Sequence, residues 1–285
     1  MKPKSGMMLR VLLNRFHKGP PDALLAVLPK EEAAEIAKIR TQSKDLDPFL
    51  ALPGARLSRI HYSWMVPIVQ SFSRGMQPIL LSALPEPHSS RLSKLLRKQS
   101  SQTALNPLFK NYLLGIFYAK LQQPEMVPWE MLPPTPMTML GQLGKPKLVE
   151  LIDFIGIYDL ASEIRHVVDK RYLERFYLCL TPKKQHFLRV CLNQKEKLAT
   201  PRLELEGWRG DCTQLAKILH RRGLLRLAGA LSGQHPDLIW HICHIFDTGR
   251  GTFLQKHVLP EEVPHVTHVL GQQVASVISF LKNKR

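Results

Sequence analysis

The sequence predicts an all-α protein built from two helical domains. Apolar residues recur at intervals of three and four along most of the chain, which is the spacing that lines one face of a helix. The stretch from Arg226 to Lys256 shows this most clearly, because it predicts helix, break, helix, break, helix. Leu238, Ile242 and Ile245 follow the helical spacing, and Pro236 suits the first turn of that helix. None of these residues has the setting of a catalytic group, so the apolar pattern of this stretch indicates helix packing.

A helix–corner–helix unit recurs along the chain, and this is the second observation that predicts the fold. Each copy has an anchor leucine that is followed by a corner, and apolar residues lie eight and eleven positions after the anchor. The anchors and their partners are Leu28 with Ile36 and Ile39, Leu84 with Leu92 and Leu95, Leu180 with Leu188 and Cys191, and Leu231 with Ile239 and Ile242. Such units build armadillo-like helical repeats. The copies are irregularly separated, and any α-helical chain can also produce such corners by chance.

The proline distribution predicts the domain boundaries. We expect an N-terminal helical domain over residues 1–121, a proline-rich linker over 122–147 and a C-terminal helical domain over 148–285. Six prolines in the linker exclude a helix interior. Interleaved apolar residues, among them Trp129 and Met139, make it too apolar for a free tether. It is therefore expected to be pinned to its own chain or to a partner.

Several local expectations follow from apolar runs and glycines. Leu105–Leu121 is so apolar that we expect a fully buried helix. Helices are also expected over Leu148–Phe154, Leu160–Val168, Tyr172–Leu180, Pro182–Gln194 and Leu259–Leu281. Asp211 is expected to cap a helix that Gly223 ends, and Asp247–Gly251 is expected to stop the helix before it. Leu203–Trp208 alternates like a short strand but is assigned to a loop or short helix.

Composition limits the classes of partner and the compartment. The chain has 40 Lys and Arg against 23 Asp and Glu, a formal net charge of +17. This charge favours an anionic partner, which could be an acidic protein, a nucleic acid or the inner face of a membrane. Four cysteines form no CxxC pair, no secretory signal is evident, and no apolar run is long enough to span a membrane. We expect a cytoplasmic protein whose thiols behave as small core residues.

No residue pattern predicts catalysis, a cofactor or a metal site. His220, His241, Cys243 and His244 lack the paired short spacings of zinc sites. Gly249-Arg250-Gly251 follows no strand and lacks the GK[ST] of a phosphate loop. Asp153 and Asp159 are a carboxylate pair that could do acid–base work, but helix-end capping is the expected role. The prediction is therefore a non-enzyme.

Part of the chain resembles the FliG family, the rotor component of the bacterial flagellar switch. The similarity rests on Leu227-Ala-Gly-Ala-Leu231-Ser-Gly233 with its following corner, on Ile60–Leu96 with its Leu-Pro corner, and on His235-Pro236. The resemblance implies a scaffold or adaptor of a flagellar-like or type III secretion assembly, with other ring or sorting-platform proteins as partners. The helix from Asp211 to Arg222 lacks the acidic set that meets the stator in FliG, so the resemblance implies scaffolding rather than torque generation.

A partner-docking site is predicted from the linker and a neighbouring basic helix face. Met and Trp are favoured at adaptable and energetically dominant contacts. The predicted partner-binding residues are Arg91, Lys94, Arg97, Met126, Trp129, Met131 and Met137. Two alternatives stay open at this point. The linker could simply pack on its own helices, and the protein could instead be a basic α-helical nucleic-acid-binding protein. For the scaffold, a peripheral contact with the inner membrane is also left open.

Overall fold

The computed structural model describes residues 3–17, 19–40, 52–98, 104–194, 198, 201–203, 205 and 208–282. Over these residues the chain forms helices joined by corners and loops, without a strand, which confirms the all-α prediction. The described residues between Leu203 and Trp208 are not in a strand either. None of the described helices has the length and apolar character needed to cross a bilayer.

The chain divides into two compact units that are not continuous in sequence. Unit 1 comprises Met1–Thr135 and Pro236–Gly251, and unit 2 comprises Pro136–His235 and Thr252–Arg285. The chain first passes from unit 1 to unit 2 between Thr135 and Pro136, inside the predicted linker of 122–147. The two halves of that linker therefore belong to different units. The second difference from the predicted domains is that residues 236–251 join the N-terminal unit instead of the C-terminal one.

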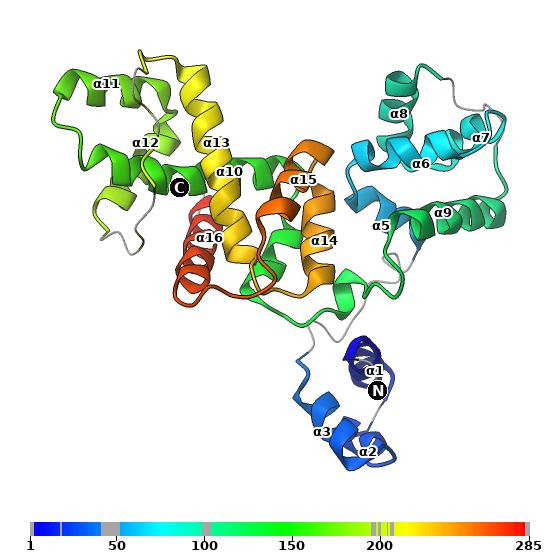
Figure 1. The fold of residues 1–285 in the computed structure, drawn as a ribbon. Coiled ribbons are helices and arrows are strands. Elements are labelled where there is room, and N and C mark those ends of the chain that lie inside the picture. Colours follow the sequence, from blue (N-terminus) through cyan, green and yellow to red (C-terminus); the bar gives the residue numbers. More distant parts are fainter. Residues whose placement is uncertain are drawn as a thin grey trace. The chain divides into compact units, whose positions relative to one another are not determined.

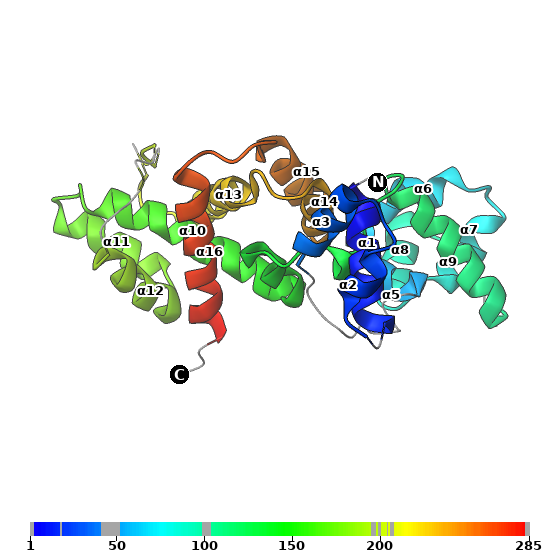
Figure 2. The same ribbon diagram turned by 90° about the horizontal axis from the view of Figure 1, so that it is seen from below.

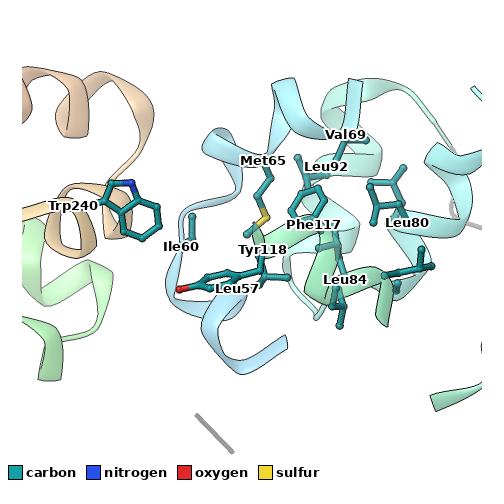
Figure 3. Packing of buried hydrophobic residues seen from close by; sticks show 14 residues of the cluster. Leu57, Ile60, Met65, Val69, Leu80, Leu84, Leu92, Phe117, Tyr118 and Trp240 are labelled. Carbon is teal, nitrogen blue, oxygen red and sulfur yellow. The ribbon is translucent and has the colours of Figure 1, made fainter. Parts of the chain in front are cut away.

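Unit 1 is a set of mostly short helices (Figure 1). They are α1 (Pro3–Phe16), α2 (Pro21–Leu25), α3 (Lys30–Lys38), α5 (Pro53–Arg59), the 3₁₀ helix η1 (Tyr62–Met65), α6 (Val66–Ser71), α7 (Met76–Ala83), α8 (His88–Leu96), α9 (Pro107–Leu121), the 3₁₀ helix η2 (Trp129–Met131) and α14 (Pro236–Ile245). The core of unit 1 lies between α5, α6, α7, α8 and α9. Figure 3 shows Leu57, Met65, Leu80 and Phe117 meeting there, all at most 1% exposed.

Helix α14 belongs to unit 1, and backbone carbonyls of this helix and of the residue after it accept hydrogen bonds from other residues of the unit. Trp240 lies beside Ile60 and joins the same apolar cluster (Figure 3). The Nε1–H of Trp64 donates to the carbonyl of Phe246 at 2.9 Å, and the N–H of His61 donates to the carbonyl of His244 at 2.7 Å. These bonds satisfy groups that would otherwise be buried without partners.

Unit 2 is built on longer helices. They are the 3₁₀ helix η3 (Pro136–Gln142), α10 (Lys145–Ile164), α11 (Lys170–Cys179), α12 (Pro182–Leu192), α13 (Cys212–Leu231) and α16 (Val266–Lys282), while α15 (Thr248–His257) begins in unit 1 and ends in unit 2. Helices α10, α13 and α16 lie side by side in Figures 1 and 2 and form the centre of this unit.

Glycines that were predicted to end helices instead lie inside them at helix crossings. A Cβ on Gly223 would lie 1.9 Å from the carbonyl oxygen of Ile152, and one on Gly156 would lie 2.1 Å from that of Leu219. Helices α10 and α13 therefore run straight through these glycines, so the predictions of a break between Phe154 and Leu160 and of a helix end at Gly223 were wrong. Only a residue without a side chain lets the two backbones approach this closely.

The same explanation applies to the break predicted at Asp247–Gly251. Helix α14 does end at Ile245, but α15 begins at Thr248 and contains both glycines. A Cβ on Gly251 would lie 2.5 Å from the carbonyl oxygen of Cys243. Asp247 is the residue that starts the new helix, since its Oδ1 accepts the N–H of Arg250 at 3.1 Å.

Helices flank all four predicted corners, at α2–α3, α7–α8, α11–α12 and α13–α14. Three of the anchor leucines, Leu84, Leu180 and Leu231, are at most 7% exposed, whereas Leu28 is half-buried. Leu95 departs from the pattern because it is 57% exposed. The unit is therefore a local helix–corner–helix motif in which the second apolar partner is not always a core residue.

The cysteines differ from the expectation of four free thiols. Cys179 and Cys212 form a disulfide across a sequence separation of 33 residues, while Cys191 and Cys243 are free and buried. Burial raises the pKa of the Cys243 thiol to about 12, as expected for an inert core residue. Only two of the four thiols thus behave as small core residues.

Candidate partner-docking surface

The histidines that could suggest a metal site serve packing in unit 1. His241 donates from Nε2 to the carbonyl of Val127 at 3.0 Å, and its ring meets Trp129 edge-on at a centroid distance of 5.8 Å. His244 donates from Nδ1 to the carbonyl of Trp240 at 2.8 Å and stacks on that indole at 3.8 Å. Burial lowers the pKa of His244 to about 4, so the ring is neutral at pH 7. The described residues contain no group of three or more potential metal ligands.

The carboxylates also have structural partners. Asp237 is 2% exposed and accepts the N–H of Val127 at 2.8 Å and the ammonium of Lys4 at 3.1 Å. Asp153 accepts from His220 at 2.7 Å and from Lys184 at 2.9 Å, so the predicted capping role of Asp153 and Asp159 was wrong. Burial tends to raise the pKa of Asp153, but the bonds from His220 and Lys184 outweigh it and the net pKa is lowered.

Asp159 is the centre of a buried ion network in unit 2. Its Oδ2 accepts from Arg222 Nε at 2.6 Å, and its Oδ1 accepts from Arg226 Nε at 2.8 Å. Arg226 is 5% exposed and also donates from Nη1 to the Oε1 of Gln273 at 2.6 Å. Asp153 and Asp159 are thus both paired with cations within the unit, as the buried Asp159 requires, and neither is placed for acid–base chemistry.

The helices α5 to α9 in unit 1 form a different electrostatic environment. Residues 53–121 contain nine Lys or Arg and a single acidic residue, Glu86. With so few carboxylates available, several of these cations lie over aromatic rings, namely Arg56 over Tyr118, Arg91 over Tyr62 and Lys120 over Phe72. A cation over a ring keeps its full charge, and the range has eight more cations than acidic residues, so this group of helices carries a field that attracts anionic groups.

The predicted basic residues lie on one exposed side of α8. Arg91, Lys94 and Arg97 are all exposed, and Leu95 between them is 57% exposed. Arg97 caps the helix in the left-handed conformation, with a φ of 52°. The opposite side of α8 is fixed in the core by Leu92, which is fully buried, so the basic side is presented by a rigid element.

An exposed apolar patch on the first two turns of α9 was not predicted. Leu108 is 80% exposed, Phe109 43% and Tyr112 65%, which corrects the expectation that Leu105–Leu121 is fully buried. Only the other face of α9 reaches the core, through Leu113, Leu114 and Phe117. Asn106 caps the helix by accepting the N–H of Leu108, so the patch sits on a well-formed helix start. We call Leu108, Phe109 and Tyr112 the α9 patch.

The linker residues are mostly used by the protein's own core. Met137 is 2% exposed and lies in unit 2, so it is not available for a partner in this structure. Met126 packs against the core of unit 1, and Trp129 and Met131 are half-buried. The neighbouring Val127 and Leu132 are buried. Packing on its own helices, the alternative considered for the linker, therefore describes most of this segment.

One short stretch of unit 1 touches both groups of predicted docking residues. Arg59, at the end of α5, donates to Glu130 beside Trp129 at 2.6 Å. Ile60 accepts from the ring of His88 on α8 at 2.7 Å, and Tyr62 lies under Arg91. The basic side of α8 and the part of the linker in η2 therefore border the same stretch.

Comparison with known proteins does not assign the chain to a family. No protein-family model matches the sequence, and the comparisons with curated proteins and with solved structures each find no match.

Proposed function

We propose that this protein is a non-catalytic scaffold or adaptor that acts through protein–protein contacts in a flagellar-like or type III secretion assembly. The assembly and its location on the cytoplasmic side, with other ring or sorting-platform proteins as partners and peripheral contact with the inner membrane, come from the resemblance to the FliG family. The contact surface is proposed from the geometry of unit 1.

The observation that carries the proposal is the α9 patch on helices that are almost free of acidic residues. Exposed, contiguous apolar groups mark interaction sites on soluble proteins. Here they are presented by helices with nine cations and one carboxylate. The matching partner surface is apolar and rimmed by Asp and Glu, as on the face of an acidic amphipathic helix.

Two other occupants of this surface fit it less well. A helix that lies in a membrane interface uses an apolar face along its whole length, but the rest of the apolar surface of α9 is buried in the core through Leu113, Leu114 and Phe117. A nucleic acid, the alternative partner, would use cations and stacking aromatics. Phe109 and Tyr112 could stack on bases, but Leu108, the most exposed of the three at 80%, would add nothing to such a contact.

The proposal is tested by cross-linking the protein in its native cell and identifying the covalent neighbours by mass spectrometry. We expect stoichiometric recovery of proteins of a membrane-associated ring, through cross-links from α8 and α9. In parallel, binding to a duplex and to a single-stranded oligonucleotide is measured at increasing salt. Tight binding with a steep loss on added salt, together with no recovered protein partner, would replace the scaffold with the nucleic-acid alternative.

A further inference from the structure

The disulfide between Cys179 and Cys212 joins the end of one short helix to the start of a long one. Cys179 is the last residue of α11 and Cys212 is the first residue of α13. Cys212 is exposed and Cys179 is partly exposed, whereas the two free cysteines are buried. The bond is therefore accessible to reagents in solution, in contrast to the other thiols of the chain.

Cys212 lies at a helix start with exposed cations nearby. A cysteine in the first turn of a helix is stabilised as a thiolate by the unpaired N–H groups there. The exposed cations Arg175 and Arg209 lie close by, because a Cβ on Gly210 would lie 3.7 Å from Arg175 Cδ and Arg209 precedes that glycine. The carboxylate of Asp211, next to Cys212, accepts the N–H of Thr213 at 2.8 Å as the helix cap.

The disulfide spans a region that is held otherwise by a small aromatic cluster. Trp208 stacks on Phe176 of α11 at a centroid distance of 4.7 Å and donates from Nε1 to the carbonyl of Asp211 at 2.9 Å. Tyr172 of α11 donates to the carbonyl of Leu205 at 3.0 Å. Leu205 and Trp208, which precede α13, thus lie against α11, and the covalent bond closes this arrangement at its solvent-exposed end.

From this geometry we propose that Cys179 and Cys212 are a reversible thiol–disulfide exchange site that sets how firmly α11 is held against α13. The reductant is a cellular dithiol. Its thiolate attacks the exposed Sγ of Cys212, forming a mixed disulfide and releasing the thiolate of Cys179. The second thiol of the reductant then closes its own disulfide and releases Cys212 as a thiolate. Two electrons pass from the dithiol to the protein, and oxidation reverses the steps.

An exchangeable pair also fits the proposed compartment. Disulfides in reducing compartments are uncommon, and those that exist there are usually transient or redox-sensing. Accessible cysteines with a stabilised thiolate and a second cysteine in reach have the properties of redox sensors. The inference stands on the geometry of unit 2 alone, so it does not depend on the docking surface in unit 1.

The test uses the full-length protein equilibrated in glutathione buffers of graded redox ratio. Free thiols are alkylated under native conditions and located by mass spectrometry, and amide hydrogen exchange is followed over the same series. We expect Cys179 and Cys212 to gain the label together as the buffer becomes reducing. Over the same range α11 loses protection from exchange while α10, α13 after its first turn and α16 keep theirs.

Two variants separate exchange from a merely structural bond. Cys179→Ser combined with Cys212→Ser is expected to show the fast exchange of α11 at every redox ratio, whereas Cys191→Ser is expected to behave as the parent protein. The proposal is overturned if the pair stays oxidised in excess dithiol until the protein unfolds. It is equally overturned if the pair never forms in oxidised glutathione, or if α11 exchanges at one rate throughout the series.

Discussion

The α10–α13 pair in unit 2 and the α5–α9 group in unit 1 differ in where their charges find partners. Between α10 and α13, Asp159 pairs with Arg222 and Arg226, and Asp153 binds His220 and also Lys184 of α12, so these cations find their partners inside the unit. The α5–α9 group contains nine cations and one acidic residue of its own, although Arg59 also pairs with Glu130 of η2, and the α9 patch is exposed on it. The comparison indicates that the α10–α13 pair uses charge to hold its helices together, while the α5–α9 group keeps an excess of positive charge.

The largest expected effect comes from breaking the buried network of unit 2. Asp159→Ala leaves the guanidinium of Arg226 buried without its counter-ion, so we expect a loss of about 3–5 kcal/mol in the free energy of unfolding. The matched control is Glu150→Ala, which removes the exposed ion pair with Lys183 and should cost at most about 1 kcal/mol. Urea denaturation measures both, and equal losses in the two variants would contradict the comparison.

Acid is expected to destabilise unit 1 through its buried histidine, His244. The folded-state pKa of His244 is lowered to about 4 by burial, so the unfolded state takes up the proton first as the pH falls below about 6.5. The stability contributed by the neutral ring is present above that pH and is lost as the pH falls towards 4, by about 3 kcal/mol in all. We expect His244→Phe to flatten the stability profile between pH 6.5 and 4, and an unchanged profile would count against the buried neutral histidine.

Close backbone contact should make the α10–α13 crossing intolerant of a single methyl group. Gly223→Ala places a Cβ 1.9 Å from the carbonyl oxygen of Ile152, so we expect about 1–3 kcal/mol of destabilisation despite the better helix propensity of alanine. Gly271→Ala on α16 is the control, because its Cβ would meet only Met137 Cε at 3.9 Å, and it should be neutral or slightly stabilising. Thermal unfolding distinguishes the two, and a stabilised Gly223→Ala variant would refute the crossing.

Reversing the basic side of α8 should leave folding intact and weaken only association. Lys94→Glu combined with Arg97→Glu changes exposed residues, so the unfolding free energy should move by less than about 0.5 kcal/mol. Partner binding should fall mainly at low salt, where exposed charges are least screened. Lys217→Glu combined with Lys256→Glu makes the same change in net charge on exposed residues of unit 2. If both pairs weaken binding alike, total charge alone matters and the α8 surface is not the site.

The sequence predicted the helical class and most helix positions, because apolar spacing carries that information directly. The predicted helix ends were wrong around Gly156, at Gly223 and at Gly251. A local pattern cannot distinguish a glycine that ends a helix from one that a neighbouring backbone touches. It failed on the α9 patch for a related reason. A helix composed almost wholly of apolar residues has no polar side, so nothing in its pattern shows which face is left exposed.

The discontinuous domain and the disulfide depend on long-range contacts. Helix α14 is joined to the rest of unit 1 by hydrogen bonds between residues more than 100 positions apart, such as the bond from the N–H of Val127 to Asp237. The pairing of Cys179 with Cys212 needs two helix ends to meet, which spacing alone does not reveal. The basic residues of α8 were found from the sequence because charge at an exposed helix position needs no tertiary contact to be recognised.

The most direct test of the docking surface is partner recovery by a protein that lacks the α9 patch. Leu108→Ser combined with Tyr112→Ser changes only exposed side chains, so circular dichroism and melting temperature should match those of the parent protein. We expect recovery of the cross-linked partner to fall to background, while Val168→Ser combined with Leu178→Ser, two exposed apolar residues of unit 2, should leave recovery unchanged. Undiminished recovery by the folded α9 variant would contradict the account.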